Sequence, residues 1–190
     1  MKSLIISVKI FLFFTILTGI AYPLLITGMT QLIFPNKANG SIILKNKTAV
    51  GSSLIGQNFN STLYFHSRPS SVSYNPLPSG GSNYSITNQK LIDSIRARKN
   101  QFIVYNKLDT LTEVPSEMLF ASASGIDPHI SPKAAYLQVE RIALYRNFDN
   151  NQKQILKKLI KNYTEPPQLL CFGEEKVNVL LLNLEVDKIK

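Results

Sequence analysis

The chain is poor in the residues on which common structural and catalytic chemistries depend. Its 190 residues include a single cysteine, Cys171, so no disulfide can form within the chain. One cysteine neither requires nor forbids an oxidising compartment, and we expect Cys171, beside Phe172, to be buried as a small apolar residue. The two histidines, His66 and His129, have no cysteine or carboxylate partners at the spacing of a metal site. We therefore expect no zinc or other metal centre.

Motifs for nucleotide and acyl chemistry are also missing. No glycine-rich loop ends in Lys-Ser or Lys-Thr, as a phosphate-binding loop does. The segment Ser79 to Asn83 (Ser-Gly-Gly-Ser-Asn) could form an anion-binding nest, but a tight turn is the commoner use of such a sequence. Ser122 and Ser124 lie near Asp127 and His129, yet Ala-Ser-Ala-Ser-Gly lacks the nucleophile-elbow pattern. The sequence therefore argues against a serine hydrolase.

One long stretch has no charge at all, from Ile10 to Asn36. A transmembrane helix needs about 20 apolar residues, and Lys9 and Lys37 flank this run where headgroups would lie. We predict a short N-terminal segment at 1–9, a transmembrane helix at 10–35 and a soluble domain at 36–190. Pro23 is expected to kink the helix, which a spanning helix tolerates.

A cleaved secretory signal is the alternative interpretation of this run. Gly19 and Ala21 resemble a cleavage site, and the first residues are basic. The apolar run continues to Phe34, however, beyond the 7–15 residues usual for a signal. We therefore expect a retained anchor.

The side of the membrane on which the domain lies is not decided by charge, because the lysines on the two sides of the run nearly balance. An apolar segment so close to the N-terminus more often acts as an uncleaved signal. We expect residues 1–9 in the cytoplasm and the domain outside it. Within the helix, Gly19, Thr27 and Gly28 offer small surfaces suited to packing against another membrane helix.

The soluble part is basic, since it contains all 12 acidic residues and all but two of the 21 Lys and Arg residues. Nucleic acid is one partner that such a balance could indicate. The densest cluster, from Lys153 to Lys161, instead lies on the polar face of an amphipathic helix, which favours a solvated face near anionic lipid. We expect no nucleic-acid partner.

Capping residues and periodicity predict a mixed α/β (α+β) domain. Short strands or turns are expected at Val50 to Phe59 and Leu63 to Arg68, and a loop over 69–88. Helices should begin after Thr87 or Asn88, after Ser131 and after Asp149. The first should bury Leu91, Ile92 and Ile95 and end near Lys99, and the last should bury a stripe from Ile155 to Tyr163. A largely buried strand is expected at Val177 to Val186. Arg141 lies on a predicted helix, where we expect a solvated or paired charge.

Several short blocks, in one order behind the N-terminal run, resemble the C subunit of the Kdp potassium-transporting P-type ATPase. The blocks are Tyr22-Pro23-Leu24-Leu25, Ala38-Asn39-Gly40-Ser41, Gly51 to Phe59, Tyr64-Phe65-His66, Arg68-Pro69-Ser70, Tyr74-Asn75-Pro76, Ser79 to Asn83, Ala121 to Ser131, then Gln138, Arg141 and Arg146, and finally Val177 to Leu184. The chain departs from the usual pattern at Tyr84-Ser85-Ile86 and at Cys171-Phe172. The resemblance covers almost the whole chain.

The resemblance implies a non-catalytic accessory subunit of an ATP-driven potassium uptake complex. Its partners would be a potassium-conducting subunit, an ATP-hydrolysing subunit and membrane lipid. The Asp-Lys-Thr-Gly phosphorylation motif of the pump is absent from this chain; Asp109-Thr110-Leu111-Thr112 only approaches it.

The family is also described as raising the ATP affinity of the hydrolysing subunit, with a Gln that matches Gln138 here. ATP would then be bound only in the assembled complex and not as a cofactor of this chain alone. A domain outside the cytoplasm would meet little ATP, so this role conflicts with the expected topology. The alternative for Gln138 is a helix-surface amide bonded to a neighbouring loop.

The loops at 68–88 and 121–131 contain the densest blocks without a catalytic set. We expect Arg68, Asn75, Asn83, Asp127 and His129 to contact a partner subunit or shape an ion entry route. A cation site on this chain is not expected, because such a site needs clustered oxygen ligands. The competing hypothesis is an independent exported enzyme or binding module that uses the anchor only as a tether.

Overall fold

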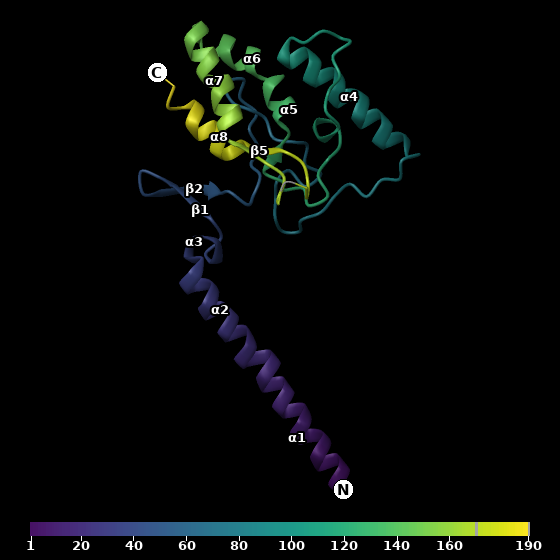
Figure 1. Cartoon of the computed structure of the whole chain (residues 1–190). Helices are drawn as coiled ribbons and strands as arrows, with labels where there is room; N and C mark the ends of the chain where they lie inside the picture. Colours follow the sequence, from purple (N-terminus) through teal and green to yellow (C-terminus); the bar gives the residue numbers. More distant parts are fainter. Residues whose placement is uncertain (170, 190) are drawn as a thin grey trace. The chain divides into compact units, whose positions relative to one another are not determined.

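The structure is a computed structural model, and it describes residues 1–169 and 171–189. The chain divides into two compact units, Met1–Ser52 and Ser53–Lys190. Each unit is described by itself below (Figure 1).

The first unit begins with a long continuous helix. It comprises α1 (Lys2–Ile16), the π-helical segment η1 (Leu17–Ala21) and α2 (Tyr22–Ile33), and it buries no residue. Length and composition make Lys2–Ile33 the one candidate membrane span among the described residues. Pro23 cannot donate to the carbonyl of Gly19, and the helix widens to η1 just there instead of breaking.

The rest of the first unit follows a break at Phe34, whose φ of −133° and ψ of 57° are not helical. A single turn, α3 (Pro35–Ala38), leads to a hairpin of β1 (Ile42–Lys45) and β2 (Thr48–Ser52). The two strands pair antiparallel, and their register shifts by one residue between Ile43, opposite Gly51, and Leu44, opposite Ala49.

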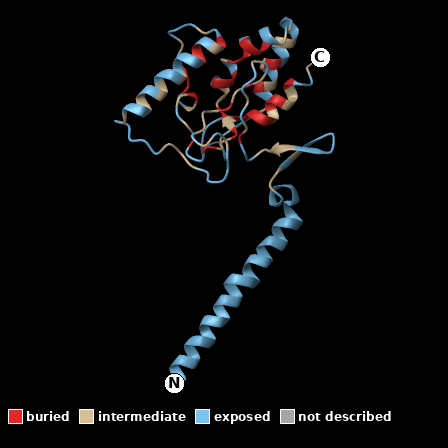
Figure 2. Ribbon diagram, turned by 180° about the vertical axis from the view of Figure 1, so that it is seen from behind, coloured by how far each residue is buried: buried red, intermediate tan, exposed pale blue. Residues whose placement is uncertain are grey.

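The second unit packs helices around a small antiparallel sheet. Its elements are α4 (Gln89–Asn106), the 3₁₀ turn η2 (Ser116–Met118), β3 (His129–Ile130), α5 (Pro132–Tyr136), α6 (Val139–Tyr145), α7 (Asn150–Asn162), β4 (Thr164–Glu165), β5 (Lys176–Asn178) and α8 (Val179–Val186). The strand order is β3-β5-β4. Buried residues gather where α5, α6, α7 and α8 meet this sheet (Figure 2).

Local signals predicted the helix starts correctly. Asn88 accepts a hydrogen bond from the amide of Lys90, and Ser131 accepts one from that of Ala134. Asp149 and Gln152 form the expected reciprocal capping box. The overall class, one N-terminal helix of membrane-spanning length before a mixed domain, is confirmed.

Two predicted elements are corrected. The strand expected at 177–186 ends at Asn178, whose side chain accepts from the amide of Leu181 and caps helix α8. That helix buries most of its sides, so its sequence lacks the alternation of polar and apolar residues that marks a surface helix. The helix expected to end near Lys99 runs to Asn106, where Lys107 closes it in a left-handed conformation. Its buried residues are Phe102, Ile103 and Asn106, while Leu91, Ile92 and Ile95 are only half-buried.

The strands or turns expected at Val50 to Phe59 and Leu63 to Arg68 are present as the end of β2 and as turns. From Ser53 to Arg68 there is no strand, because backbone amides there are bonded to side chains of the helices instead of to a neighbouring strand. The burial predicted for Cys171 is wrong, because this residue is exposed. Arg141, expected as a solvated or paired charge, is fully buried and bonded to uncharged oxygens.

Candidate functional site

A buried polar network ties the segment at 62–66 to helices α6 and α8. The side-chain amide of Asn183 accepts from the amide of Phe65 (2.8 Å) and donates to its carbonyl (2.9 Å). The side-chain amide of Gln138 likewise accepts from the backbone amide of His66 (2.8 Å) and donates to its carbonyl (3.3 Å). Each side-chain amide thus bonds both the N–H and the C=O of one residue, as a neighbouring strand would do in a β-sheet. Without these bonds, the buried backbone groups would have no hydrogen-bond partner.

Arg141 is the centre of this network and has no exposed surface. Its guanidinium donates to Oδ1 of Asn106 and to the carbonyls of Thr62 and Tyr64. It also lies over the ring of Tyr105, with its Cζ 5.0 Å from the ring centre. Burial lowers the pKa of Arg141 to about 10. A cation held by carbonyl and amide oxygens, without a carboxylate, serves to fix the chain around it.

Gln138 is likewise fully buried, so its expected place on the helix surface is wrong, although its bond to a loop is found. Its Oε1 accepts from His66 and Arg141, and its Nε2 donates to the carbonyls of His66 and Ala134. Both ends of the amide are therefore occupied within the chain. A nucleotide contact for Gln138 stays a prediction.

His66 also lines a hollow of about 450 Å³, together with aromatic and polar side chains. Among them are Phe102, Tyr105 and Arg98, whose Nη1 donates to the carbonyl of Leu119 at 2.8 Å. Burial, together with the nearby charge of Arg141, lowers the pKa of His66 to about 4. His66 is therefore neutral at ordinary pH.

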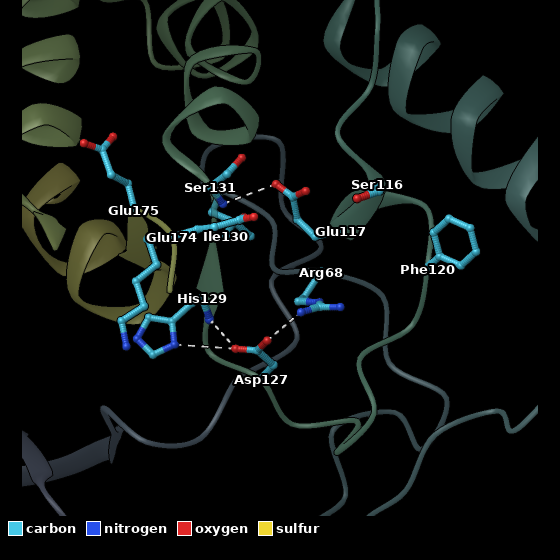
Figure 3. A pocket seen from close by; sticks show the side chains of 11 residues that line it. Arg68, Ser116, Glu117, Phe120, Asp127, His129, Ile130, Ser131, Glu174 and Glu175 are labelled. Carbon is cyan, nitrogen blue, oxygen red and sulfur yellow. Dashed lines mark hydrogen bonds and ion pairs between the residues drawn. The ribbon is translucent and has the colours of Figure 1, made fainter. Parts of the chain in front are cut away.

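Three of the predicted partner-binding residues come together in a second hollow, of about 710 Å³ (Figure 3). Arg68 Nη1 donates to Asp127 at 2.7 Å, and the backbone amide of His129 donates to the other oxygen at 3.0 Å. The His129 ring nitrogen lies 3.5 Å from the same oxygen. Partial burial acts to raise the pKa of Asp127, but the bonds from His129 and the charge of Arg68 lower it to about 2.

The walls of this hollow carry mixed charge. Glu117, Glu174, Glu175 and Lys176 line it with the triad of Arg68, Asp127 and His129. Glu117 accepts from the amide of Ser131, which begins helix α5. No described side chains bring together a nucleophile, a base and an orienting group here, and the described residues include no group of three or more His, Cys, Asp or Glu that could hold a metal ion. The hollow therefore presents side chains of both charges on its walls.

The two loops predicted to contact a partner are bound to each other. The amide of Ser122 donates to the carbonyl of Pro69 (3.1 Å), and that of Gly80 donates to Ser124 (3.0 Å). Ser70 Oγ donates to the carbonyl of Gly125 at 2.6 Å. Loops 68–88 and 121–131 therefore form one surface, although they are distant in sequence.

The remaining predicted residues are not among those that line the hollow of about 710 Å³. Asn75 and Asn83 are exposed, and the side chain of Asn75 accepts from the amide of Leu77. In the first unit, Gly19 and Gly28 have nothing within 4 Å of where a Cβ would stand, and Thr27 is exposed. The partners of all these residues stay predictions.

Sequence reasoning missed Arg141, Asn106 and Asn183 as site-building residues. One signal was present, because Gln138 and Arg141 are three residues apart and so share a helix face with each other. Their long-range contacts, to residues 35 or more positions away, left no local mark.

Comparisons with known proteins match nearly the whole chain. The family model for the K+-transporting ATPase, c chain (KdpC), matches residues 4–188. The potassium-transporting ATPase KdpC subunit of Photorhabdus laumondii is 44% identical over 96% of this chain and 94% of its own length. That of Caldanaerobacter subterraneus is 42% identical over 95% of this chain and 92% of its own length. The subunit of Escherichia coli is 43% identical over 100% of this chain and 99% of its own length. The chain therefore belongs to the KdpC family, the c chain of the K+-transporting ATPase.

Proposed function

We propose that this chain is a membrane-anchored, non-catalytic accessory subunit that assembles and stabilises a potassium-transporting ATPase complex. The observation that carries the proposal is the family match over residues 4–188. The side chains of the candidate site support a non-catalytic role. Gln138, Arg141 and Asn183 form hydrogen bonds with the backbone of residues 64–66, which serves the fold.

The specific partners are a potassium-conducting subunit and an ATP-hydrolysing subunit. Two separate surfaces are offered to them: the joined loops 68–88 and 121–131 in the second unit, and the small residues of the anchor in the first unit. Purification of the complex through a tag on this chain should bring both subunits with it. Deletion of the chain should abolish potassium uptake at low external potassium, and a plasmid copy should restore it. Recovery of this chain alone, with normal uptake after its deletion, would support the tethered independent module instead.

We further propose that residues 1–9 face the cytoplasm and residues 36–190 lie outside it. Ser41→Cys and Asn150→Cys should react with a membrane-impermeant thiol reagent in intact cells. The exposed Cys171 is first changed to Ser to remove its own reaction. Reaction only after lysis would reverse the orientation.

A contribution to the ATP affinity of the complex is the finer part of the proposal. Gln138 supports the backbone of His66, which lines the 450 Å³ hollow, so it could act on that hollow only through His66. The measurement is the KM for ATP of complexes carrying Gln138→Glu or the wild-type chain, with unfolding midpoints measured beside it. A raised KM at unchanged stability would assign a nucleotide role, whereas lower stability at unchanged KM would assign a purely structural one.

A further inference from the structure

The first unit has charge of one sign only. No Asp or Glu occurs before Asp93, so Met1–Ser52 carries five lysines and no acidic side chain. Three of these, Lys37, Lys45 and Lys47, follow the membrane-length helix within fifteen residues of its end at Ile33. Such a cluster next to a span is attracted to anionic lipid headgroups.

The β1–β2 hairpin shows an apolar face that the unit itself leaves uncovered. Ile42 and Leu44 are 60% and 65% exposed. Side chains alternate along a strand and directly paired residues share a face, so Leu44 lies beside Ala49, its partner in the register. An isolated two-stranded hairpin is at best marginally stable in water. The hairpin therefore needs a surface to cover this face.

The turn of the hairpin holds its lysines in place. Asn46 and Lys47 both have positive φ, at 52° and 65°, as the two central residues of a tight hairpin turn require. Lys45 ends β1 directly before this turn, and Lys47 is part of it. Both positive charges are thus fixed at one tip of the hairpin.

The hairpin is bound to the end of the membrane helix. The side-chain amides of Gln31 and Asn39 donate to each other reciprocally at 3.2 Å, across the break at Phe34. The amide of Ser41 donates to the carbonyl of Asn36, and Ser52 Oγ donates to that of Gly40. These bonds join both strands to the segment that leaves α2, so the hairpin stays near the point where the helix exits the bilayer.

The length of the helix indicates where it leaves the bilayer. The uncharged helical residues from Ile10 to Ile33 span roughly 36 Å at 1.5 Å per residue, slightly more than the ~30 Å hydrocarbon core. The end of α2 thus reaches the headgroup layer, and the hairpin begins nine residues later at Ile42.

We propose that residues 35–52 form a membrane-surface element that seats the hairpin on anionic phospholipid. Lys37, Lys45 and Lys47 contact phosphate groups, while Ile42 and Leu44 enter the boundary between headgroups and acyl chains. The proposal depends on the membrane span and not on the potassium function, so it can fail or hold independently of that function.

The test uses the full chain in vesicles, with one tryptophan as a probe. The chain has no Trp, so Leu44→Trp introduces a single reporter on the apolar face. The vesicles contain equal parts of phosphatidylcholine and phosphatidylglycerol, with or without bromine near the top of the acyl chains. Emission is read on chain that resists carbonate extraction. Leu111→Trp, at a site that is 91% exposed in the second unit, is the matched control.

We expect bromine to reduce the Leu44→Trp emission by roughly half, since an interfacial residue lies ~5–10 Å deep in the headgroup and acyl boundary. The Leu111→Trp emission should not change. Adding Lys45→Ser and Lys47→Gly should weaken the quenching, and Gly keeps the positive φ of the turn. Replacing phosphatidylglycerol by phosphatidylcholine should weaken it equally.

Four results would overturn the proposal. The first is Leu44→Trp emission that is unquenched and typical of a water-exposed ring. The second is protection that depends on the protein-to-lipid ratio, which would indicate a second copy of the chain as the occupant. The third is protection that occurs only in the assembled complex, which would assign the hairpin to another subunit. The fourth is quenching of the same size with and without anionic lipid, because the proposal assigns contacts between the lysines and the phosphates of anionic lipid.

Discussion

Arg141 Nη2 donates a hydrogen bond to Gln138 Oε1 at 2.9 Å, one helical turn away, and neither side chain reaches solvent. The same Gln138 oxygen accepts from the amide of His66, and the same Arg141 nitrogen donates to the carbonyl of Tyr64. Two side chains of one helical turn thus bind the backbone of Tyr64 and His66, which lie more than 70 residues earlier in the sequence. The segment that precedes the joined loops is therefore positioned by this pair.

Arg141→Met should be among the most destabilising substitutions in the second unit. It leaves the carbonyls of Thr62 and Tyr64 and the Oδ1 of Asn106 without their donor in a buried place. Removing one partner of a buried charged network costs about 3–5 kcal/mol. Denaturant unfolding of the detergent-solubilised chain measures the loss. Lys153→Met breaks only the exposed pair with Glu140 and should cost under ~1 kcal/mol. Equal losses for the two variants would contradict the role given to Arg141.

Stability should fall on mild acidification because of His66. Its pKa is about 4 in the folded chain and 6.5 ordinarily, so between these values the unfolded chain binds a proton that the folded chain does not. The full stabilisation is present above pH 6.5 and is lost as the pH falls toward 4. A shift of this size corresponds to roughly 3 kcal/mol.

Unfolding midpoints measured from pH 7 to pH 4 test this linkage. His66→Gln removes the titrating group and should flatten the dependence, whereas His129→Gln should keep it. Asp127 acts in a lower window, because its folded pKa of about 2 lies below the ordinary 3.8. Its stabilisation is present above pH 3.8 and is lost between there and pH 2. An unchanged slope in His66→Gln would mean that another group carries the effect.

The starts of the helices were more predictable than their ends or their buried faces. Asn88, Ser131 and Asp149 cap helices through bonds to residues two or three positions away, so the sequence nearby contains the whole signal. Helix α8 was mistaken for a strand because burial on most sides removes the helical period.

The burial of Arg141 could not be read locally, because its partners lie 35 to 79 residues away. The two loops that resemble the family are bonded to each other in the structure, and their contact with a partner stays a prediction. Only the fold brings Arg68 to Asp127, 59 positions on, and no periodicity marks such a pair.

Arg68 and Asp127 should show strong coupling in a double-mutant cycle. Their side chains are about a quarter exposed and joined at 2.7 Å, and a hydrogen bond between charged groups contributes roughly 1.5–3 kcal/mol. Arg68→Ala and Asp127→Ala should therefore cost much less together than the sum of the two. Unfolding and co-purification are measured on the same four chains.

The two measurements separate a fold-supporting role from a partner-binding one. If the pair only joins the loops, assembly should fall in proportion to stability. If it also meets a partner, at least one single variant should lose co-purification and potassium uptake beyond its loss of stability. Additive effects on stability would contradict the coupling itself.

Gly125 should be intolerant of any side chain. Its φ is +71°, and an added Cβ would lie 2.8 Å from the carbonyl oxygen of Gly80, within the joined loops. Gly125→Ala should destabilise the chain by about 1–3 kcal/mol or more through overpacking and backbone strain. Gly80→Ala is the control, since its Cβ would meet nothing within 4 Å. A tolerated Gly125→Ala would mean that the two loops separate easily.

The last prediction concerns how the anchor is held by a neighbouring helix. Gly28 has open space around it in this chain and lies in α2, where a small residue lets another backbone approach closely. Gly28→Leu should fill that space and release the chain from the purified complex at detergent concentrations that leave the wild type bound. Gly28→Ala stays small and should be retained, as should Leu25→Ile, which changes shape without adding volume. All three variants should remain in the membrane fraction, because each keeps the span apolar. Equal co-purification of Gly28→Leu and Gly28→Ala would place the helix contact on another face of the anchor, and release of Leu25→Ile alone would place it at Leu25.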